Sequence, residues 1–418
     1  MHKKYFICLA VGLSLLIGSL GFFFLRSQGF RKSSNIIKVG ILHSQSGAMA
    51  ESEQGLINAE LLAIEEINTR GGVLGKKLVP VIVDGKSDGT IFAQGAEKLI
   101  TQEKVPVIFG CWTSASRKSV KPVVEKHKNL LMYPLQYEGL EQSPNIIYMG
   151  ATPNQQIIPA VTWACRFLGK KFFLIGSDYV FPRVAHEIMK ECIAAQGGTV
   201  VGEAFLLLDA TDAALAVKDI VATKPDVILN CINGTTNKVF FKQLRAASIT
   251  PEKVPTISFS IAEPELASLG TSDLVGDYAV WSYIQAIERQ ENFDTIEKFR
   301  KKFGEKSVFS DPMEAAYNNV HLWALAVQST KNTNSTAVIA ALKKQFFNGP
   351  GSIIYLDENN HAWRHIFIGK IMYDRQFSIV WSSKKAVPPC PFPPYRTVAT
   401  WEELLNKLFV GWGQKWQK

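Results

Sequence analysis

The sequence lacks the short motifs that build most cofactor and nucleophile sites. No GxGxxG pattern follows the first expected strand, and the 418 residues contain no P-loop, HExxH or GxSxG motif. The six cysteines are scattered without a CxxC pair, which argues against a zinc site and is typical of buried free thiols, with one disulfide still open. His361 and His365 flank an expected turn and strand, so no metal site is predicted there. We therefore expect no metal, no cofactor and no enzymatic activity.

The main body also lacks an excess of either charge. Residues 1–35 carry five basic and no acidic residues, residues 384–418 carry six basic and two acidic residues, and together these ends account for the net charge of +9. A nucleic-acid-binding domain needs a basic face, so no nucleic-acid partner is expected. Basic ends beside a neutral body fit contact with an anionic membrane surface better.

The N-terminus has the pattern of a targeting segment. Lys3 and Lys4 precede an uncharged stretch from Tyr5 to Leu25, and Arg26 follows it. The stretch of about 21 residues is longer than the usual core of a signal peptide and long enough to span a bilayer. No clear cleavage site or lipobox is present. The pattern favours a signal anchor over residues 1–35, with a cleaved signal peptide as the alternative, and a body outside the cytoplasm.

Strands and helices alternate through the body. Strands are expected at 36–42, 77–83, 105–109 and 130–133, separated by helices at 52–68, 90–102 and 116–127. The alternation restarts after Pro153, with helices at 155–168, 182–196, 212–223 and 236–247 and strands at 171–175, 199–206, 227–230 and 256–259. This order predicts two α/β units, each an open parallel sheet with helices on both faces.

The last third of the body is expected to add elements to both units. A strand at 276–285 is followed by helices at 295–303, 311–328 and 335–344 and strands at 353–356, 365–373 and 377–381. Pro388–Pro394 then predicts a stiff, extended segment. A final helix places apolar side chains on one face, namely Trp401, Leu404, Leu405, Leu408, Phe409 and Trp412. That face could dock on a membrane or a partner, or pack back on the body.

Polar and aromatic residues follow the expected strands of the first unit. Trp112, Thr113 and Ser114 come after the third strand, where hydroxyls and backbone N–H groups open a helix. The hydroxyls could hold a ligand or only cap that helix. Tyr133, Gln136 and Tyr137 follow the fourth strand. Ligands of doubly wound sheets bind beyond the carboxyl ends of the strands, so these residues are candidates for a site.

The second unit shows the same arrangement. Tyr179 and Phe181 follow one of its strands, and Asn233 and Thr235 follow another. If the two units face each other, these ends form a cleft of aromatic rings, hydroxyls and amides. Such a cleft suits a small, planar, uncharged polar solute, because a buried polar group without a hydrogen bond costs about 1–3 kcal/mol.

Several stretches resemble the urea and short-chain amide binding proteins of the type I periplasmic binding fold. They extend from about residue 36 to residue 394 and are VGILHSQSG (39–47), AIEEIN (63–68), GGVLGK (71–76), FGCWTSASRK (109–118), YPLQYEG (133–139), PNQQ (153–156), KKFFLIGSDYVFPR (170–183), FFKQL (240–244) and DPMEAAY (311–317). The segments GCWTSASRK and GSDYVFPR are the most specific.

The resemblance implies a fold, a site and a partner. The fold has two Rossmann-like lobes joined by three hinge crossovers, with lobe 1 at 36–152 plus 285–349, lobe 2 at 153–284 plus 350–386, and a C-terminal segment at 387–418. The ligand site would include Trp112, Ser114, Tyr133, Tyr137, Tyr179 and Phe181. Thr235 stands where urea binders have an acidic residue, and Glu263 matches an acidic run that Pro264 interrupts.

The function implied is that of a solute-binding component. It would capture urea or a short-chain amide and deliver it to an ABC permease in the membrane. The alternative is a membrane-anchored sensor that uses the same cleft. An amidohydrolase would need a nucleophile with a base, or a metal, and the sequence shows neither.

Overall fold

The computed structural model describes residues 35–268 and 270–418, so the predicted N-terminal anchor lies outside the described residues. Residues 37–418 form one compact unit. Within the described part of the chain, no helix combines the length and the apolar character needed to cross a membrane.

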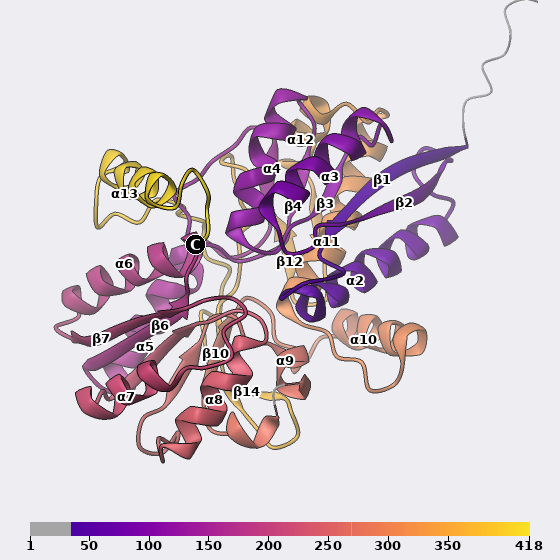
Figure 1. Cartoon of the computed structure of the whole chain (residues 1–418). Coiled ribbons are helices and arrows are strands. Elements are labelled where there is room, and N and C mark those ends of the chain that lie inside the picture. The colour runs from indigo at the N-terminus through magenta and orange to yellow at the C-terminus, as the bar shows by residue number, and fades with distance from the viewer. Residues whose placement is uncertain (1–34, 269) are drawn as a thin grey trace, which may run out of the picture. The chain divides into compact units, whose positions relative to one another are not determined.

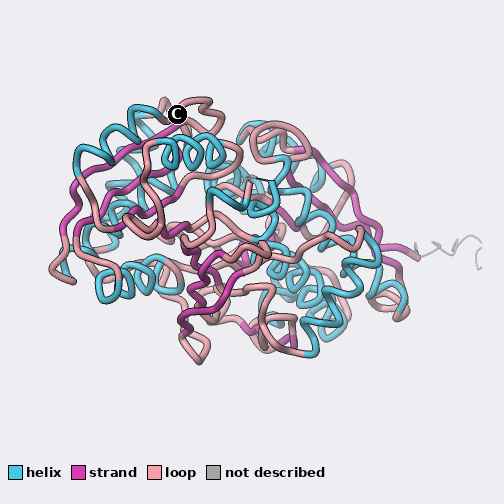
Figure 2. The backbone as a smooth tube through the Cα atoms, turned by 90° about the horizontal axis from the view of Figure 1, so that it is seen from below, coloured by secondary structure: helices cyan, strands magenta, loops and turns pink. Residues whose placement is uncertain are grey.

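The first lobe is built on a five-stranded sheet of order β2-β1-β3-β4-β5, in which β1, β3, β4 and β5 run parallel. Its strands are β1 (Ile36–His43), β2 (Lys77–Asp84), β3 (Ile108–Gly110), β4 (Leu131–Tyr133) and β5 (Ile146–Tyr148). The helices between them are α2 (Ala50–Thr69), α3 (Gly89–Thr101) and α4 (Ser114–Lys126). Strands β3, β4 and β5 are fully buried apolar runs, as expected for parallel strands whose sheet is covered by helices, whereas the edge strand β2 is largely half-buried (Figure 2).

The second lobe is built on a seven-stranded sheet of order β14-β13-β10-β9-β8-β6-β7. Its strands are β6 (Lys171–Ser177), β7 (Thr199–Leu206), β8 (Val227–Cys231), β9 (Thr256–Ser258), β10 (Tyr278–Trp281), β13 (Phe367–Ile371) and β14 (Phe377–Ser382). Strands β6 to β10 are parallel, whereas β13 and β14 add antiparallel at one edge. Its helices are α5 (Ile157–Phe167), α6 (Val180–Ala195), α7 (Ala214–Thr223), α8 (Thr236–Ala246) and α9 (Glu263–Ser268), with 3-10 turns η1 (Pro153–Gln155) and η2 (Thr271–Asp273).

The chain returns to the first lobe after β10. This part contains α10 (Gln290–Phe303), α11 (Asp311–Thr330), α12 (Ser335–Leu342), β11 (Phe346–Asn348) and β12 (Ile353–Tyr355). Helix α11 packs along α2, and its Trp323 meets Phe109 of β3 edge to face with ring centroids 6.1 Å apart. Residues 353–362 also pack here, because Ala362 joins this core and His361 pairs with Tyr148. The sequence had assigned them to the second lobe.

The C-terminal segment lies against the body. Helix α13 (Val398–Gly411) buries Trp401 and Leu405 in the core of the second lobe and contacts α6 (Figure 1). Of the two alternatives, the apolar face of this helix therefore packs back on the body. The five described cysteines are free thiols, and four of them are buried. The α/β fold of two lobes joined by crossovers, expected from the sequence, is confirmed.

Candidate functional site

The two lobes touch where the carboxyl ends of their strands meet. The indole Nε1 of Trp112 donates to Oδ1 of Asn233 at 3.4 Å, and Nε2 of Gln136 donates to the carbonyl of Phe259 at 2.9 Å. Ser52 Oγ donates to Glu265 Oε1 at 3.0 Å. We call this region the inter-lobe interface and define it by Ser52, Trp112 and Gln136 of the first lobe with Asn233, Phe259 and Glu265 of the second.

Trp112 is held at the exit of β3 by its neighbours. Its side chain is buried, and its carbonyl accepts a hydrogen bond of 2.7 Å from the Tyr133 hydroxyl. Tyr133 itself is buried at the end of β4. The structure therefore brings Trp112 and Tyr133 together. The Trp112 indole contacts the second lobe, and the Tyr133 hydroxyl bonds the Trp112 backbone within the first lobe.

The hydroxyls after Trp112 are used within the first lobe. Thr113 is the N-cap of α4, and its Oγ1 accepts from the backbone N–H of Ser116 at 3.0 Å. Ser114 donates to Glu138 and accepts from Arg117 at 3.0 Å. Of the two roles considered for these hydroxyls, Thr113 therefore caps the helix. Ser114 instead takes part in a buried ionic network.

Arg117 is the centre of that network and could not be identified from the strand ends alone. Its guanidinium carbon lies 4.7 Å from the ring centroid of Tyr133 and 4.5 Å from that of Tyr137, and it bonds Glu141 and Glu138 at 2.9 and 3.2 Å. Burial alone would raise the pKa of the Glu141 carboxyl, but Arg117 and Lys118 hold it well below its usual range. Tyr137 therefore packs its ring against the guanidinium of this network, and its hydroxyl forms a hydrogen bond with His361 Nε2 at 2.5 Å.

Gln136 spans the two lobes with one polar atom unused. Its amide NH₂ bonds the carbonyl of Phe259, which also accepts from Gln156 at 3.3 Å. Its Oε1 is buried without a hydrogen-bond partner among the described residues, and so is the Oγ of Ser260 next to Phe259. Since such groups are rarely left unpaired, they mark this part of the interface as suited to a polar ligand.

The aromatic pair of the second lobe lies at the start of α6. Tyr179 is the N-cap residue of that helix, and Phe181 lies in its first turn. Both side chains are buried, with ring centroids 6.2 Å apart. The charge of Glu138 and the phenol of Tyr133 act on the Tyr179 phenol, whose pKa is raised well above its usual value mainly by burial.

The two residues predicted to bind solute in the loop after β8 lie in different surroundings. Asn233 is buried at the interface, and its backbone N–H donates to Ser177 Oγ at 3.0 Å. Thr235 is exposed at the start of α8, where its carbonyl accepts from Lys238 at 3.0 Å. The structure therefore does not bring the Thr235 side chain to the interface.

Two buried carboxyls lie on α9. Glu263 Oε1 accepts from the backbone N–H of Gln285 at 2.7 Å. Burial, with the nearby Asp311 and Glu265, raises the pKa of Glu263 to about 8. Burial raises the pKa of Glu265 to about 7, although Ala262 N–H and Ser52 donate to its carboxyl. Sequence reasoning selected Glu263 and missed Glu265, which makes the contact with the first lobe.

We expect the free energy of unfolding to fall as the pH rises from about 4.5, the ordinary pKa of a glutamate carboxyl, to about 8. A carboxyl with a raised pKa keeps a proton that the unfolded chain has released, so rising pH favours unfolding by up to about 1.4 kcal/mol per pH unit for each group. His43, whose pKa is raised from 6.5 to about 9 by Glu60 and Glu53 against the effect of burial, acts in the same direction as the pH rises from 6.5 to 9. The measurement is chemical denaturation at several pH values of the chain with Glu263→Gln and Glu265→Gln, which should have a shallower slope.

The matched control is Glu103→Gln. Glu103 pairs with Lys38 on the surface, and this partner lowers its pKa, so its ionisation causes no fall in stability as the pH rises. Its slope should equal that of the unmodified chain. An unchanged slope in the double variant would contradict the assignment of these carboxyls.

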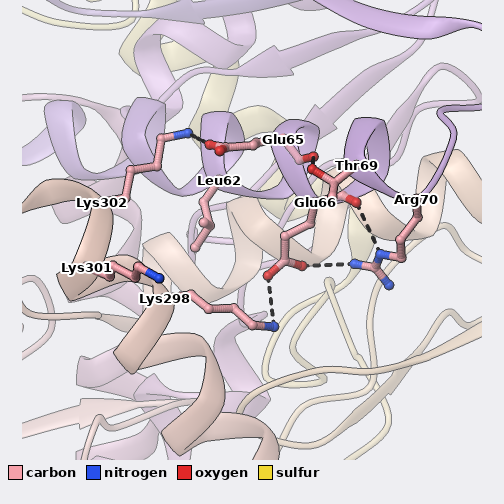
Figure 3. Close-up of a pocket in the computed structure, with 8 residues that line it drawn as sticks. All are labelled: Leu62, Glu65, Glu66, Thr69, Arg70, Lys298, Lys301 and Lys302. Carbon is pink, nitrogen blue, oxygen red and sulfur yellow. Dashed lines mark hydrogen bonds and ion pairs between the residues drawn. The ribbon is translucent and has the colours of Figure 1, made fainter.

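A separate cavity of about 570 Å³ lies between α2 and α10 (Figure 3). Its lining residues are Leu62, Glu65, Glu66, Thr69, Arg70, Lys298, Lys301 and Lys302. The Glu66 carboxylate forms ion pairs with Arg70 at 3.0 Å and with Lys298 at 3.1 Å. Hydrogen bonds from His321, Tyr317 and Lys298 outweigh the effect of burial and lower its pKa to about 2. The cavity is lined by none of the residues predicted to bind solute.

Comparison with known proteins places these features in context. The model of the periplasmic binding protein domain family matches residues 37–398. Limonene hydroxylase of Geobacillus stearothermophilus is 28% identical over 123 residues, which are 29% of this chain and 23% of that protein. Leu/Ile/Val-binding protein homolog 7 of Brucella abortus (strain 2308) is 37% identical over 101 residues, 23% of this chain and 24% of that protein. The chain thus spans about a quarter of the length of these curated relatives.

A solved structure covers far more of the chain. The solute binding protein of an ABC transporter from Rhodopseudomonas palustris BisB5 superposes with a TM-score of 0.78 and 23% identity, over 85% of this chain and 99% of that one. This likeness concerns the fold. Because the family match includes both lobes and their interface, the chain belongs to the periplasmic binding protein domain family.

Proposed function

We propose that this chain is the solute-binding component of an ABC importer, located in the periplasm or otherwise outside the cytoplasm. It captures urea or a short-chain amide between its lobes and delivers it to a membrane permease. The residues proposed to bind the solute are Trp112, Gln136, Tyr179, Phe181 and Asn233. The family and the two-lobed fold support the transport role.

The ligands of relatives provide the main competing solutes. The Rhodopseudomonas palustris protein was solved in complex with 3,4-dihydroxy benzoic acid, and the Brucella protein is named for leucine, isoleucine and valine. These compounds carry a carboxylate, which a closed site must match with a cation or with several donors.

The observation that favours a neutral solute is the pairing of the cations beside the interface. Arg117 and Lys118 are both buried, and each is bonded to carboxylates of Glu138 and Glu141. Two positive and two negative groups leave no excess charge there for a ligand carboxylate. The unused Oε1 of Gln136 is an acceptor suited to the N–H group of an amide.

Calorimetry of the full chain tests this assignment. We expect binding heat with at least one of urea, formamide and acetamide, and none with leucine or benzoate. Heat with leucine or benzoate and none with the amides would overturn the solute class. Ammonia release during incubation with the bound amide would overturn the role as a binding protein.

A further inference from the structure

The last five residues of the chain, Gln414–Lys418, contact both lobes, and we call them the C-terminal strap. They follow α13 after a turn at Gly413, whose φ of +66° is the left-handed conformation that glycine adopts easily. In Figure 1 the C-terminus lies beside α6, where the two lobes come together. The strap begins beyond residue 398, where the match to the family ends.

The strap binds the second lobe through its backbone. The N–H of Val180 donates to the carbonyl of Trp416 at 3.0 Å, and the N–H of Lys418 donates to the carbonyl of Asp178 at 3.2 Å. Tyr179 and Gln417 form the antiparallel bridge between these bonds. The strap is therefore paired with the loop that carries Tyr179, one of the proposed solute-binding residues.

The strap meets the first lobe through the Trp416 ring. The Nζ of Lys118 on α4 lies 4.8 Å from the centroid of that ring, within the range of a cation–π contact. Phe409 of α13 supports the ring from a centroid distance of 4.6 Å. A cavity of about 430 Å³ is lined jointly by the strap and by residues of α3 and α4, including Ala115 and Ser119.

The segment before the strap fixes its position. The N–H of Cys390 donates to Asn154 Oδ1 at 2.8 Å, and the N–H of Leu140 donates to the carbonyl of Pro391 at 2.8 Å. Arg396 then pairs with Glu187 and Glu191 of α6 at 2.9 and 2.7 Å. These contacts hold residues 390–396 on the body. The position from which α13 and the strap begin is therefore fixed.

We propose that the C-terminal strap ties the two lobes together in their closed arrangement and thereby sets how fast the solute leaves. Five residues that bind Asp178–Val180 on one lobe and Lys118 on the other can keep both sets of contacts only while the lobes are close. Opening the lobes must break one set. The statement about solute release rests on the proposed function, whereas the tie between the lobes does not.

The test compares the full chain with a chain that ends at Gln414 and with Trp416→Ala. The truncation leaves all of α13, and the single substitution keeps the backbone pairing while removing the ring over Lys118. Val410→Ala is the control, since Val410 lies on α13, just before the strap, and is 61% exposed. Dissociation of acetamide is followed by stopped flow. Hydrogen exchange without solute is measured at Phe259–Glu265, which meet the first lobe through Gln136 and Ser52.

We expect both strap variants to release acetamide about 5–30-fold faster and to exchange faster at Phe259–Glu265, because a cation–π contact and its packing contribute on the order of 1–2 kcal/mol. The control should match the full chain. Equal rates of acetamide release and equal rates of hydrogen exchange in all chains would contradict the proposal that the strap ties the lobes together. If the full chain binds no amide while exchange still rises in the variants, the strap stands and the proposed solute is wrong.

Discussion

Replacing Arg117 by methionine should lower the free energy of unfolding by about 3–5 kcal/mol, the cost of leaving buried charges without their partner. Glu138 and Glu141 would lose the guanidinium that bonds them at 3.2 and 2.9 Å. Tyr133 and Tyr137 would lose the cation that lies between their rings. The measurement is guanidinium chloride denaturation at neutral pH, because urea is itself one of the proposed solutes.

Arg70→Met is the matched control for this experiment. Arg70 pairs with Glu66 one helical turn away, and its side chain is 66% exposed. Exposed pairs contribute about 0.2–1 kcal/mol, so its loss should be small. A loss below about 1 kcal/mol for Arg117→Met would show that the buried carboxyls find other partners. Arg117→Lys keeps the charge without the two-pronged geometry and should fall between these values.

Trp112→Ala should weaken solute binding by about 30-fold or more, since a buried aromatic at the centre of an interface typically contributes at least about 2 kcal/mol. The indole is 5% exposed and reaches Asn233 of the other lobe. Its loss removes an aromatic wall and the hydrogen bond that joins two strand ends. Calorimetry with the solute that the full chain binds gives the change in Kd.

Two further variants separate these contributions. Trp112→Phe keeps a ring and removes only the N–H, so it should bind more tightly than Trp112→Ala. Trp363→Ala removes a half-buried indole that bonds Asp357 and packs on Tyr355, and it should leave the affinity unchanged. Equal affinity of Trp112→Ala and the unmodified chain would place the solute elsewhere.

The fold could be predicted because each element carries its own local pattern. Apolar runs such as Phe172–Ile175 marked buried strands, and the helices between them showed apolar spacing on one face. Shorter elements lack such signals. Strand β5 has three residues, and α9 has six and begins with Glu263-Pro264, so neither was expected. Helix α10 starts at Gln290, five residues before the predicted helix, in a polar stretch without apolar spacing.

The sequence predicted which residues lie at the inter-lobe interface better than it predicted what they contact there. The strand ends located Trp112, Gln136 and Asn233, since parallel strands place their carboxyl ends at one edge. The hydrogen-bond partner of each hydroxyl at the strand ends depends on residues that are distant in the sequence. Ser114 bonds Glu138, and Glu265 meets Ser52 across 213 residues of sequence. Such pairs leave no trace in local spacing.

The return of the chain to the first lobe has a consequence for its synthesis. Helix α11 covers α2 and β3, yet its residues follow β5 by more than 150 positions, after most of the second sheet. At roughly 5–20 residues per second, a ribosome needs on the order of 10–30 s to supply it. During that time Leu56, Ile57 and Phe109 lack their final apolar cover, which includes Trp323. Folding of the first lobe is therefore completed late, and the nascent chain keeps part of this apolar surface uncovered until Trp323 has been added.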